Sequence, residues 1–268
     1  MKRVVDINDP RLDPYRDLKH NKYPEESTYF IAEGRLVVER LLNTDFEVES
    51  ILLSSQSTDE PEWLAGVSCP VLSVAPEVCQ QLVGFPFHRG VLACGGRIIR
   101  RQLDFQGVSS SSLLICCPET ALAENLGAMI RSGVALGAEG VVLGATTIDP
   151  FSRRSIRTSM GNCFRLPISQ PHDLGAELAR LKGCHGFETI GLSLKPAAVN
   201  ITQLKFPPRT ILMFGNEGHG LRSEHASMCD RHVKIPMSEG VDSLNVAAAA
   251  AISMFAYRQS ISLEPTHE

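Results

Sequence analysis

The sequence predicts an α/β protein with two α/β domains. Segments typical of strands alternate with segments of helical periodicity along most of the chain. Near the C-terminus, two strand-like segments each lead through a loop into a helix. Alternation at this density favours a mainly parallel sheet, with a ligand crevice outside the carboxyl ends of its strands. With 268 residues, the chain is long enough for two modest domains that each bury a core.

An arm and a small α/β domain are expected in the first part of the chain. Residues 1–28 are polar and contain three prolines, so we predict a mostly irregular arm with one helical turn. Residues 100–112 lose apolar periodicity and end in four serines, which places the domain boundary near residue 108. Helices are predicted at residues 33–42, 61–65 and 76–83, and strands at residues 50–54, 71–75 and 91–94.

The second domain opens with a strand, a helix and a strand, the pattern of a βαβ unit. Asn125 is predicted to cap the first helix and Ser243 the last, with Asn245 in the first turn of that last helix. Pattern alone predicts an ordinary doubly wound sheet. Strands are predicted at residues 113–117, 141–143, 189–194, 210–214 and 232–235, and helices at residues 125–136, 174–181, 221–228 and 243–259.

Composition places the chain among ordinary folded proteins. Its 43% hydrophobic and 21% charged residues exclude wholesale disorder. The longest apolar stretch, residues 246–257, is too short to span a bilayer, and the N-terminus turns acidic before any apolar signal region could form. We therefore expect a cytoplasmic protein without a membrane anchor.

The cysteines give no indication of a metal site. None of the eight cysteines belongs to a C-x-x-C pair. Cys116 and Cys117 are adjacent in a predicted strand, so they face opposite sides of the sheet and cannot chelate one ion together. We expect the cysteines to be reduced and mostly buried, and we expect no metal.

The two C-terminal loops favour a nucleoside-type ligand without phosphates. Residues 215–220 read Gly-Asn-Glu-Gly-His-Gly, and glycines let the backbone approach a ligand closely. Their order, G-x-x-G-x-G, matches neither the dinucleotide fingerprint nor the P-loop. The second loop, residues 238–242, carries two carboxylates and no lysine or arginine, which would repel a pyrophosphate.

Two residues have more than one reading from spacing alone. Arg131 follows Gly127 and Ala128 by one helical turn, so it could reach towards a groove or form a surface ion pair. Glu217 could act in acid–base chemistry or accept backbone N–H bonds in its glycine turn. No nucleophile motif such as G-x-S-x-G is present.

Two arginine-rich segments stand out in a chain of net charge −4, which itself argues against indiscriminate nucleic-acid binding. Neither segment, residues 88–101 or residues 151–165, contains an acidic residue. Each could be a solvated face, but together they favour a specific polyanion site. The arginines concerned are Arg89, Arg97, Arg100 and Arg101 in the first, and Arg153, Arg154 and Arg157 in the second.

Three segments together resemble the ordered motifs of the SpoU/TrmH methyltransferases of the SPOUT class. They are residues 125–132, residues 214–220 and residues 235–247, and the similarity extends nearly continuously over residues 113–258. Residues 30–34 and 88–93 resemble the ribosomal-protein-L30-like (L30e-like) substrate-binding domain often attached to this family. The resemblance implies an N-terminal arm at 1–28, an L30e-like α/β RNA-binding domain at 29–108 and a SPOUT α/β methyltransferase domain with a trefoil knot at 109–268.

The activity that the resemblance implies is methyl transfer from S-adenosylmethionine to a ribose 2′-hydroxyl of structured RNA. The extra domain favours rRNA over tRNA, and the family implies a homodimer. Arg131 matches the catalytic arginine, and we expect it to orient the hydroxyl and stabilise the developing alkoxide. Further catalytic-site residues are Asn125, Glu217, Ser243 and Asn245. Cofactor contacts are implied for Leu192, Ser193, Gly215, Asn216, Glu217, Gly218, Ile235, Met237, Ser243, Leu244 and Asn245, and the seven arginines above are expected to bind RNA phosphates.

One departure from the family pattern bears on function. The family often has Asp-Pro before the first-motif Asn, where this chain has Leu122-Ala123-Glu124. The alternative hypothesis is therefore a catalytically inactive RNA-binding protein that retains the SPOUT fold and cofactor pocket. A nucleotide-using α/β enzyme is a second alternative, which the missing phosphate motifs disfavour.

Overall fold

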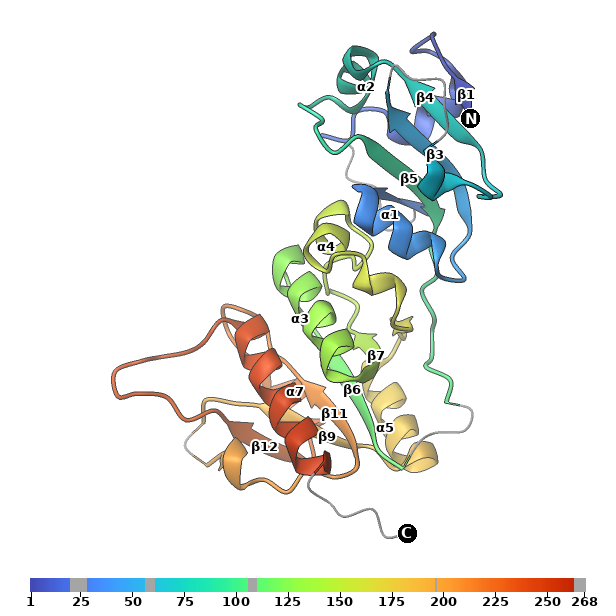
Figure 1. Ribbon diagram of the computed structural model, residues 1–268. Coiled ribbons are helices and arrows are strands. Elements are labelled where there is room, and N and C mark those ends of the chain that lie inside the picture. The colour runs from blue at the N-terminus through green and yellow to red at the C-terminus, as the bar shows by residue number, and fades with distance from the viewer. Residues whose placement is uncertain (20–27, 56–60, 106–109, 196, 263–268) are drawn as a thin grey trace. The chain divides into compact units, whose positions relative to one another are not determined.

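The computed structural model describes residues 1–19, 28–55, 61–105, 110–195 and 197–262, which form two compact units (Figure 1). Unit 1 comprises Met1–Ile98 and Asp149–Phe164, and unit 2 comprises Ile99–Ile148 and Arg165–Glu268. The boundary predicted near residue 108 lies outside the described residues. The contacts group Asp149–Phe164 with unit 1, although we expected this segment in the C-terminal domain.

Unit 1 is built on a mixed five-stranded sheet. Strands β1, β4 and β3 are parallel, and β5 is antiparallel to both β3 and β2. The order across the sheet is β1 (Lys2–Arg3), β4 (Val71–Val74), β3 (Val48–Ser54), β5 (Val91–Gly96) and β2 (Tyr29–Glu33). Its α-helices include α1 (Arg35–Leu42) and α2 (Pro76–Val83), and the helix predicted at residues 61–65 is a short 3-10 turn, Glu62–Leu64.

The described part of the N-terminal arm belongs to the core of unit 1. Its predicted helical turn is present as a 3-10 helix at Pro10–Tyr15. Leu12 and Tyr15 on that turn are fully buried, and the Tyr15 hydroxyl donates to the carbonyl of Ser50 at 3.0 Å. The arm is therefore less independent than its polar sequence suggested.

Asp149–Phe164 is held in unit 1 by aromatic and ionic contacts. The segment contains α4 (Arg153–Thr158), and Phe151 and Phe164 stack on Phe30 with ring centroids 5.5 and 5.0 Å away. Arg97 pairs with Asp149 at 2.5 Å, and Arg153 pairs with Glu33 at 2.8 Å. Aromatic burial and two shielded ion pairs thus fix this segment.

Unit 2 contains the parallel sheet that the sequence predicted. Every pairing among its seven strands is parallel. The strand predicted at residues 210–214 is β11, Arg209–Met213, and the strand predicted at 113–117 is β6. The order is β10 (Val199–Asn200), β12 (Arg231–Lys234), β9 (Glu188–Leu192), β11, β6 (Ser112–Cys117), β7 (Ala138–Leu143) and β8 (Ile168–Ser169).

Helices cover both faces of this sheet. Successive side chains of β6 point to opposite faces and all are buried, so each face needs a covering layer. Leu114 and Cys116 pack in a buried cluster with Leu178 and Leu181 of α5 (Leu174–His185). On the other face, a Cβ at Gly133 of α3 (Ala123–Leu136) would lie 2.4 Å from the side chain of Ile115. Helix α3 packs there beside α7 (Val246–Ser262), as Figure 1 shows. The α/β fold class is therefore confirmed, whereas the knot and the L30e-like character of unit 1 stay predictions.

Both predicted helix caps are wrong. The N-cap position of α3 is Leu122, and Asn125 lies inside the helix. Helix α7 begins at Val246, and its first turn is capped by Asn245, whose Oδ1 accepts from the N–H groups of Ala247 and Ala248 at 2.9 and 3.3 Å. Sequence reasoning assigned a local role to Asn125, but long-range contacts determine its position.

Two expectations about burial can be compared with the described residues. Five cysteines are buried, as expected: Cys79, Cys94, Cys116, Cys117 and Cys163. Burial raises the pKa of the Cys117 thiol to about 12, which keeps it protonated near neutral pH. Within the described ranges, the length and apolarity that a bilayer-crossing helix needs are not met by any helix.

Candidate active site

One cavity lies at the carboxyl ends of four adjacent strands of unit 2, where parallel α/β sheets bind their ligands. Its volume is about 720 Å³, and the loops after β6, β9, β11 and β12 form its wall. All of the predicted cofactor-binding residues line it: Leu192, Ser193, Gly215, Asn216, Glu217, Gly218, Ile235, Met237, Ser243, Leu244 and Asn245. Residues from the loops after three different strands, β9, β11 and β12, thus share one cavity.

The glycine loop that follows β11 is closed on itself. Asn216 and Gly220 exchange two backbone hydrogen bonds at 3.0 and 2.9 Å, and the Asn216 Oδ1 accepts from the Gly218 N–H at 2.9 Å. A Cβ at Gly215 would lie 2.2 Å from the backbone of Gly220, and Gly220 itself has φ +67. Glycine is therefore required at both ends of the loop, by close approach at one and by backbone conformation at the other.

A chain of hydrogen bonds joins the three motifs beside this cavity. The Glu217 Oε1 accepts from the Asn125 side chain at 2.9 Å and from the Leu122 N–H at 3.2 Å, and its Oε2 accepts from the Ala121 N–H at 3.1 Å. The Asn125 Oδ1 accepts from the Asn245 side chain at 3.0 Å, and Asn245 caps α7. Each motif therefore fixes the next.

These bonds bear on the two readings of Glu217. Burial raises the pKa of its carboxyl, but hydrogen bonds from Asn125 and from the backbone N–H groups of Glu217, Ala121 and Leu122 outweigh it, so the pKa lies below the usual value. An ionised carboxylate that accepts hydrogen bonds from Ala121, Leu122 and Asn125 is suited to hold the loop before α3. The contacts favour this reading over proton transfer by Glu217.

Arg131 lies apart from the cavity wall. It is exposed in the middle of α3, and no hydrogen bond or ion pair joins it to another of the described residues. Arg131 therefore has no stabilising ion pair within the described part of its own chain, and its guanidinium is accessible to an RNA or to another chain.

The predicted RNA-binding arginines divide into two groups. Arg97, with only 7% of its side chain exposed, and Arg153, with 19%, are committed to the carboxylates of Asp149 and Glu33. Arg100, Arg101 and Arg154 are exposed, Arg157 is half-buried, and Arg89 is 47% exposed although it lies 3.4 Å from Glu33. The ion pairs favour a structural role for Arg97 and Arg153.

Sequence reasoning missed part of the cavity wall. The additional residues lie next to predicted ones, at the ends of β9 and β12 and in the segment after the glycine loop, so extending each motif to its strand end would have found most of them. Asn125, a predicted catalytic-site residue, also lines the cavity; the missed residues are Leu122, Leu194, Lys195, Phe214, His219, Gly220, Leu221, Ala226, His232, Val233, Val246 and Ala249.

The cavity suits a nucleoside that carries a sulfonium rather than phosphates. Leu192, Val233 and Ile235 offer apolar surface to a base, and the glycine loop offers main-chain groups. Among the described lining residues, Lys195 is the only lysine or arginine, too little positive charge for a pyrophosphate site. This donor set fits S-adenosylmethionine.

Sequence comparison matches this chain to RNA methyltransferases. The family model described as "SpoU rRNA Methylase family" matches residues 112–255. The protein named "Uncharacterized tRNA/rRNA methyltransferase Rv0881" of Mycobacterium tuberculosis is 34% identical over 260 residues, which cover 94% of this chain and 90% of that protein. The Bacillus subtilis protein named "23S rRNA (guanosine(2553)-2'-O)-methyltransferase RlmP" is 24% identical over 96% of this chain and 100% of its own length.

Solved structures show the same fold over nearly the whole chain. The AdoMet-bound rRNA methyltransferase from Sinorhizobium meliloti superposes with a TM-score of 0.81 at 25% identity, covering 98% of this chain and 99% of that one. The SpoU methyltransferase AviRb from Streptomyces viridochromogenes also gives 0.81 at 25% identity, covering 94% of this chain and 98% of its own.

Proposed function

Because the chain belongs to the SpoU rRNA methylase family, we propose that it transfers a methyl group to a ribose 2′-hydroxyl of ribosomal RNA. Family membership makes it an S-adenosylmethionine-dependent RNA methyltransferase. The proposed part is that its substrate is ribosomal RNA. The observation that carries the proposal is the single cavity lined by residues of three separated motifs, at the carboxyl ends of β6, β9, β11 and β12. A ribosomal RNA substrate would place the protein in the cytoplasm.

The cofactor would be held by the glycine loop, by Leu192 and Ser193, and by the segment from Ile235 to Asn245. Bound there, S-adenosylmethionine supplies a methyl group on a sulfonium sulfur. The protein contributes position: the closed loop after β11 and the Glu217–Asn125–Asn245 bonds hold the cavity wall. A wall held by such bonds favours affinity and alignment of the cofactor.

Arg131 is proposed to act on the ribose. A guanidinium is almost never neutral in proteins, so it would orient the hydroxyl or an adjacent phosphate and stabilise the developing alkoxide. Because Arg131 lies outside the wall of its own cavity, this role fits a homodimer in which each site is completed near the subunit interface. Exposed apolar residues on α7, Ile252 at 41% and Phe255 at 54%, offer a surface for such a contact beside α3.

Ribosomal RNA is favoured over transfer RNA by an additional unit and by named relatives. Unit 1 accompanies the catalytic sheet, and the Bacillus subtilis relative, which matches over 100% of its own length, is named for 23S rRNA. Arg89, Arg100, Arg101, Arg154 and Arg157 are the arginines proposed to bind phosphates, since Arg97 and Arg153 serve ion pairs within unit 1.

The inactive alternative gains no support from the altered loop. Residues 121 and 122 donate to the Glu217 carboxylate, so the loop before α3 is held although it lacks the family's Asp-Pro.

Calorimetry provides the first test, and binding of S-adenosylmethionine without added metal is expected.

The second test is incubation with labelled cofactor and separated rRNA and tRNA from cells that lack the gene, followed by nucleoside analysis. A 2′-O-methylated nucleoside from rRNA is expected. Methylation of a base, or of tRNA alone, would overturn the proposal.

A further inference from the structure

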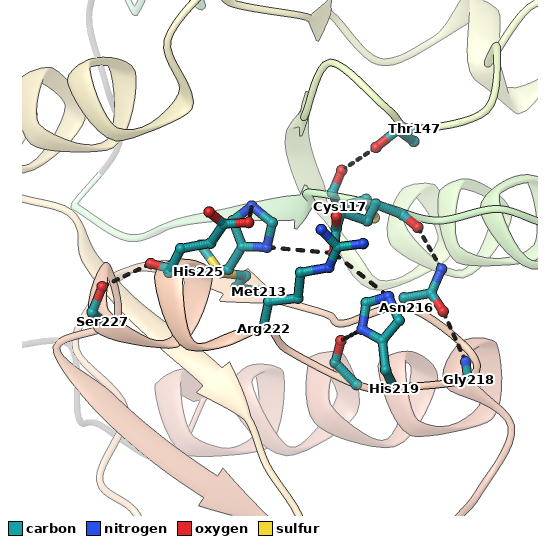
Figure 2. Close-up of polar contacts among 12 residues, drawn as sticks. Cys117, Thr147, Met213, Asn216, Gly218, His219, Arg222, His225 and Ser227 are labelled. Atoms are coloured by element: carbon teal, nitrogen blue, oxygen red, sulfur yellow. Dashed lines mark hydrogen bonds and ion pairs between the residues drawn. The ribbon is translucent and has the colours of Figure 1, made fainter.

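Glu119, in the loop after β6, contacts the glycine loop and the segment that follows it. Its backbone carbonyl accepts from the Asn216 side chain at 2.9 Å. Its carboxylate Oε2 lies 3.8 Å from His219 Nε2, 3.2 Å from Arg222 Nε and 3.6 Å from His225 Nδ1. Figure 2 shows the side chains of His219, Arg222 and His225 pointing towards one another from different positions along this segment.

The partners of Glu119 lie in the glycine loop or just beyond it. Asn216 opens the glycine loop, His219 lies within it, and Arg222 and His225 lie just beyond it. Two of these partners, Asn216 and His219, line the cavity, and Arg222 and His225 are chain neighbours of the lining residues Leu221 and Ala226. One residue of the β6–α3 loop therefore contacts both ends of a cavity-forming segment.

Burial makes this carboxylate dependent on its partners. Only 11% of the Glu119 side chain is exposed, and none of the described residues donates a hydrogen bond to its buried Oε2. Burying a carboxylate costs free energy, which a nearby cation such as Arg222 offsets. The groups that face it are His219, Arg222 and His225, and Glu224 lies beyond His225 at 4.0 Å from its Nε2.

This cluster does not suit a metal ion. Glu119, Glu224 and His225 do offer ligand atoms within 4.8 Å of one another. However, the guanidinium of Arg222 already lies 3.2 Å from Glu119 Oε2 and would repel a second cation there. The arrangement is that of a carboxylate shared by basic side chains.

We propose that Glu119 is a positioning residue for the cofactor loop, which holds His219, Arg222 and His225 so that residues 215–221 keep the shape of the cavity wall. Glu119 itself does not line the cavity, so its effect passes through these partners. The inference rests on the proposed place of S-adenosylmethionine in this cavity. Wild-type protein that fails to bind the cofactor would contradict that placement, whereas the variants below test Glu119 alone.

The test compares Glu119→Gln with Glu224→Gln in the full chain. The first variant keeps the shape and the backbone carbonyl of Glu119 but removes its charge. The second is a matched control, because Glu224 is 63% exposed and lies on the outer side of His225. Calorimetry measures the affinity for S-adenosylmethionine and for S-adenosylhomocysteine, whose sulfur is neutral, and steady-state kinetics measures KM and kcat.

Glu119→Gln is expected to lower the affinity for both ligands by about tenfold, the loss expected when a partly desolvated ion pair is removed. KM for S-adenosylmethionine should rise by about the same factor with kcat close to wild type at saturation, and Glu224→Gln should stay within about twofold of wild type. Affinity unchanged in Glu119→Gln would overturn the proposal. So would weaker binding of S-adenosylmethionine alone, because that result indicates a direct charge effect on the cationic cofactor.

Arg222→Gln provides a second variant if Glu119→Gln folds poorly. It removes the nearest cation from a side chain that is 56% exposed, so the fold should tolerate it. We expect weaker binding of both ligands, and the double variant should bind no more weakly than Glu119→Gln. Effects that simply add would show that the two residues act separately and would contradict the proposal.

Discussion

Replacing Asn125 with alanine should destabilise unit 2 and leave unit 1 unchanged. The change removes two hydrogen bonds, one to the Glu217 carboxylate at 2.9 Å and one from the Asn245 side chain at 3.0 Å. A bond to a charged group contributes about 1.5–3 kcal/mol and a neutral bond about 0.5–1.5 kcal/mol. Because both partners lie at the cavity, where water can replace part of the loss, we expect a decrease of about 2 kcal/mol in the free energy of unfolding.

The chain offers an internal control for this measurement. Its single tryptophan, Trp63, lies in unit 1, so tryptophan fluorescence during urea unfolding reports that unit. Hydrogen exchange at β11 and the first turn of α7 reports unit 2. We expect Asn125→Ala to lower protection in unit 2 while the fluorescence midpoint stays at its wild-type value.

A double-mutant cycle with Asn245→Ala isolates the contact between the two asparagines. Asn245→Ala alone removes the cap of α7, at a cost of about 1 kcal/mol. The two changes should be coupled by about 0.5–1.5 kcal/mol, because both remove the same hydrogen bond. A loss below about 0.5 kcal/mol for Asn125→Ala, or strict additivity within error, would refute the reasoning.

Further predictions concern Glu217, Gly215 with Gly183 as its control, and Arg131. The pKa of Glu217 is lowered in the folded protein, so its contribution to stability is complete above the ordinary glutamate pKa of 4.5 and is lost as pH falls through the folded-state pKa. Glu217→Gln should therefore flatten the decline in melting temperature below about pH 4.5, and an unchanged decline at acid pH would contradict this. Gly215→Ala should abolish detectable cofactor binding in calorimetry, because its Cβ would meet the Gly220 backbone at 2.2 Å. Gly183→Ala in α5 is the control: its Cβ meets nothing within 4 Å, and the free energy of unfolding should rise by about 0.5–1 kcal/mol. Arg131→Ala should lower the single-turnover rate by about 10²–10³ with cofactor affinity unchanged, and Arg131→Lys should rescue little; rates within a few-fold of wild type would make Arg131 structural.

Periodic segments were the part of the fold that could be predicted from sequence. The helix predicted at residues 76–83 is α2, Pro76–Val83, because its proline start and apolar spacing are local signals. Strand β2 was missed, since Tyr29–Glu33 has only a short apolar run and is defined by its pairing with β5. Local pattern therefore identifies elements whose own sequence carries the signal.

Contacts between distant residues account for the rest. Arg97 lies in a segment of the sequence without acidic residues and was therefore predicted to bind RNA. In the structure it forms a shielded ion pair with Asp149, 52 positions away. Asn125 looked like a cap, but it lies within α3, and its side chain donates to the Glu217 carboxylate, 92 positions away. The motif order was enough to predict which residues gather around the cavity, although not the role that each has there.

Comparative mapping of ribose methylation in ribosomal RNA tests the central claim most directly. Cells with the gene, without it, and without it but carrying the Arg131→Ala variant would be compared by a method that detects 2′-O-methyl groups at single nucleotides. The account predicts one or a few ribosomal RNA positions that lose methylation without the gene and do not regain it with Arg131→Ala, while the wild-type gene restores them. Ribosomal RNA methylation that is identical in all strains, or restored fully by Arg131→Ala, would contradict it.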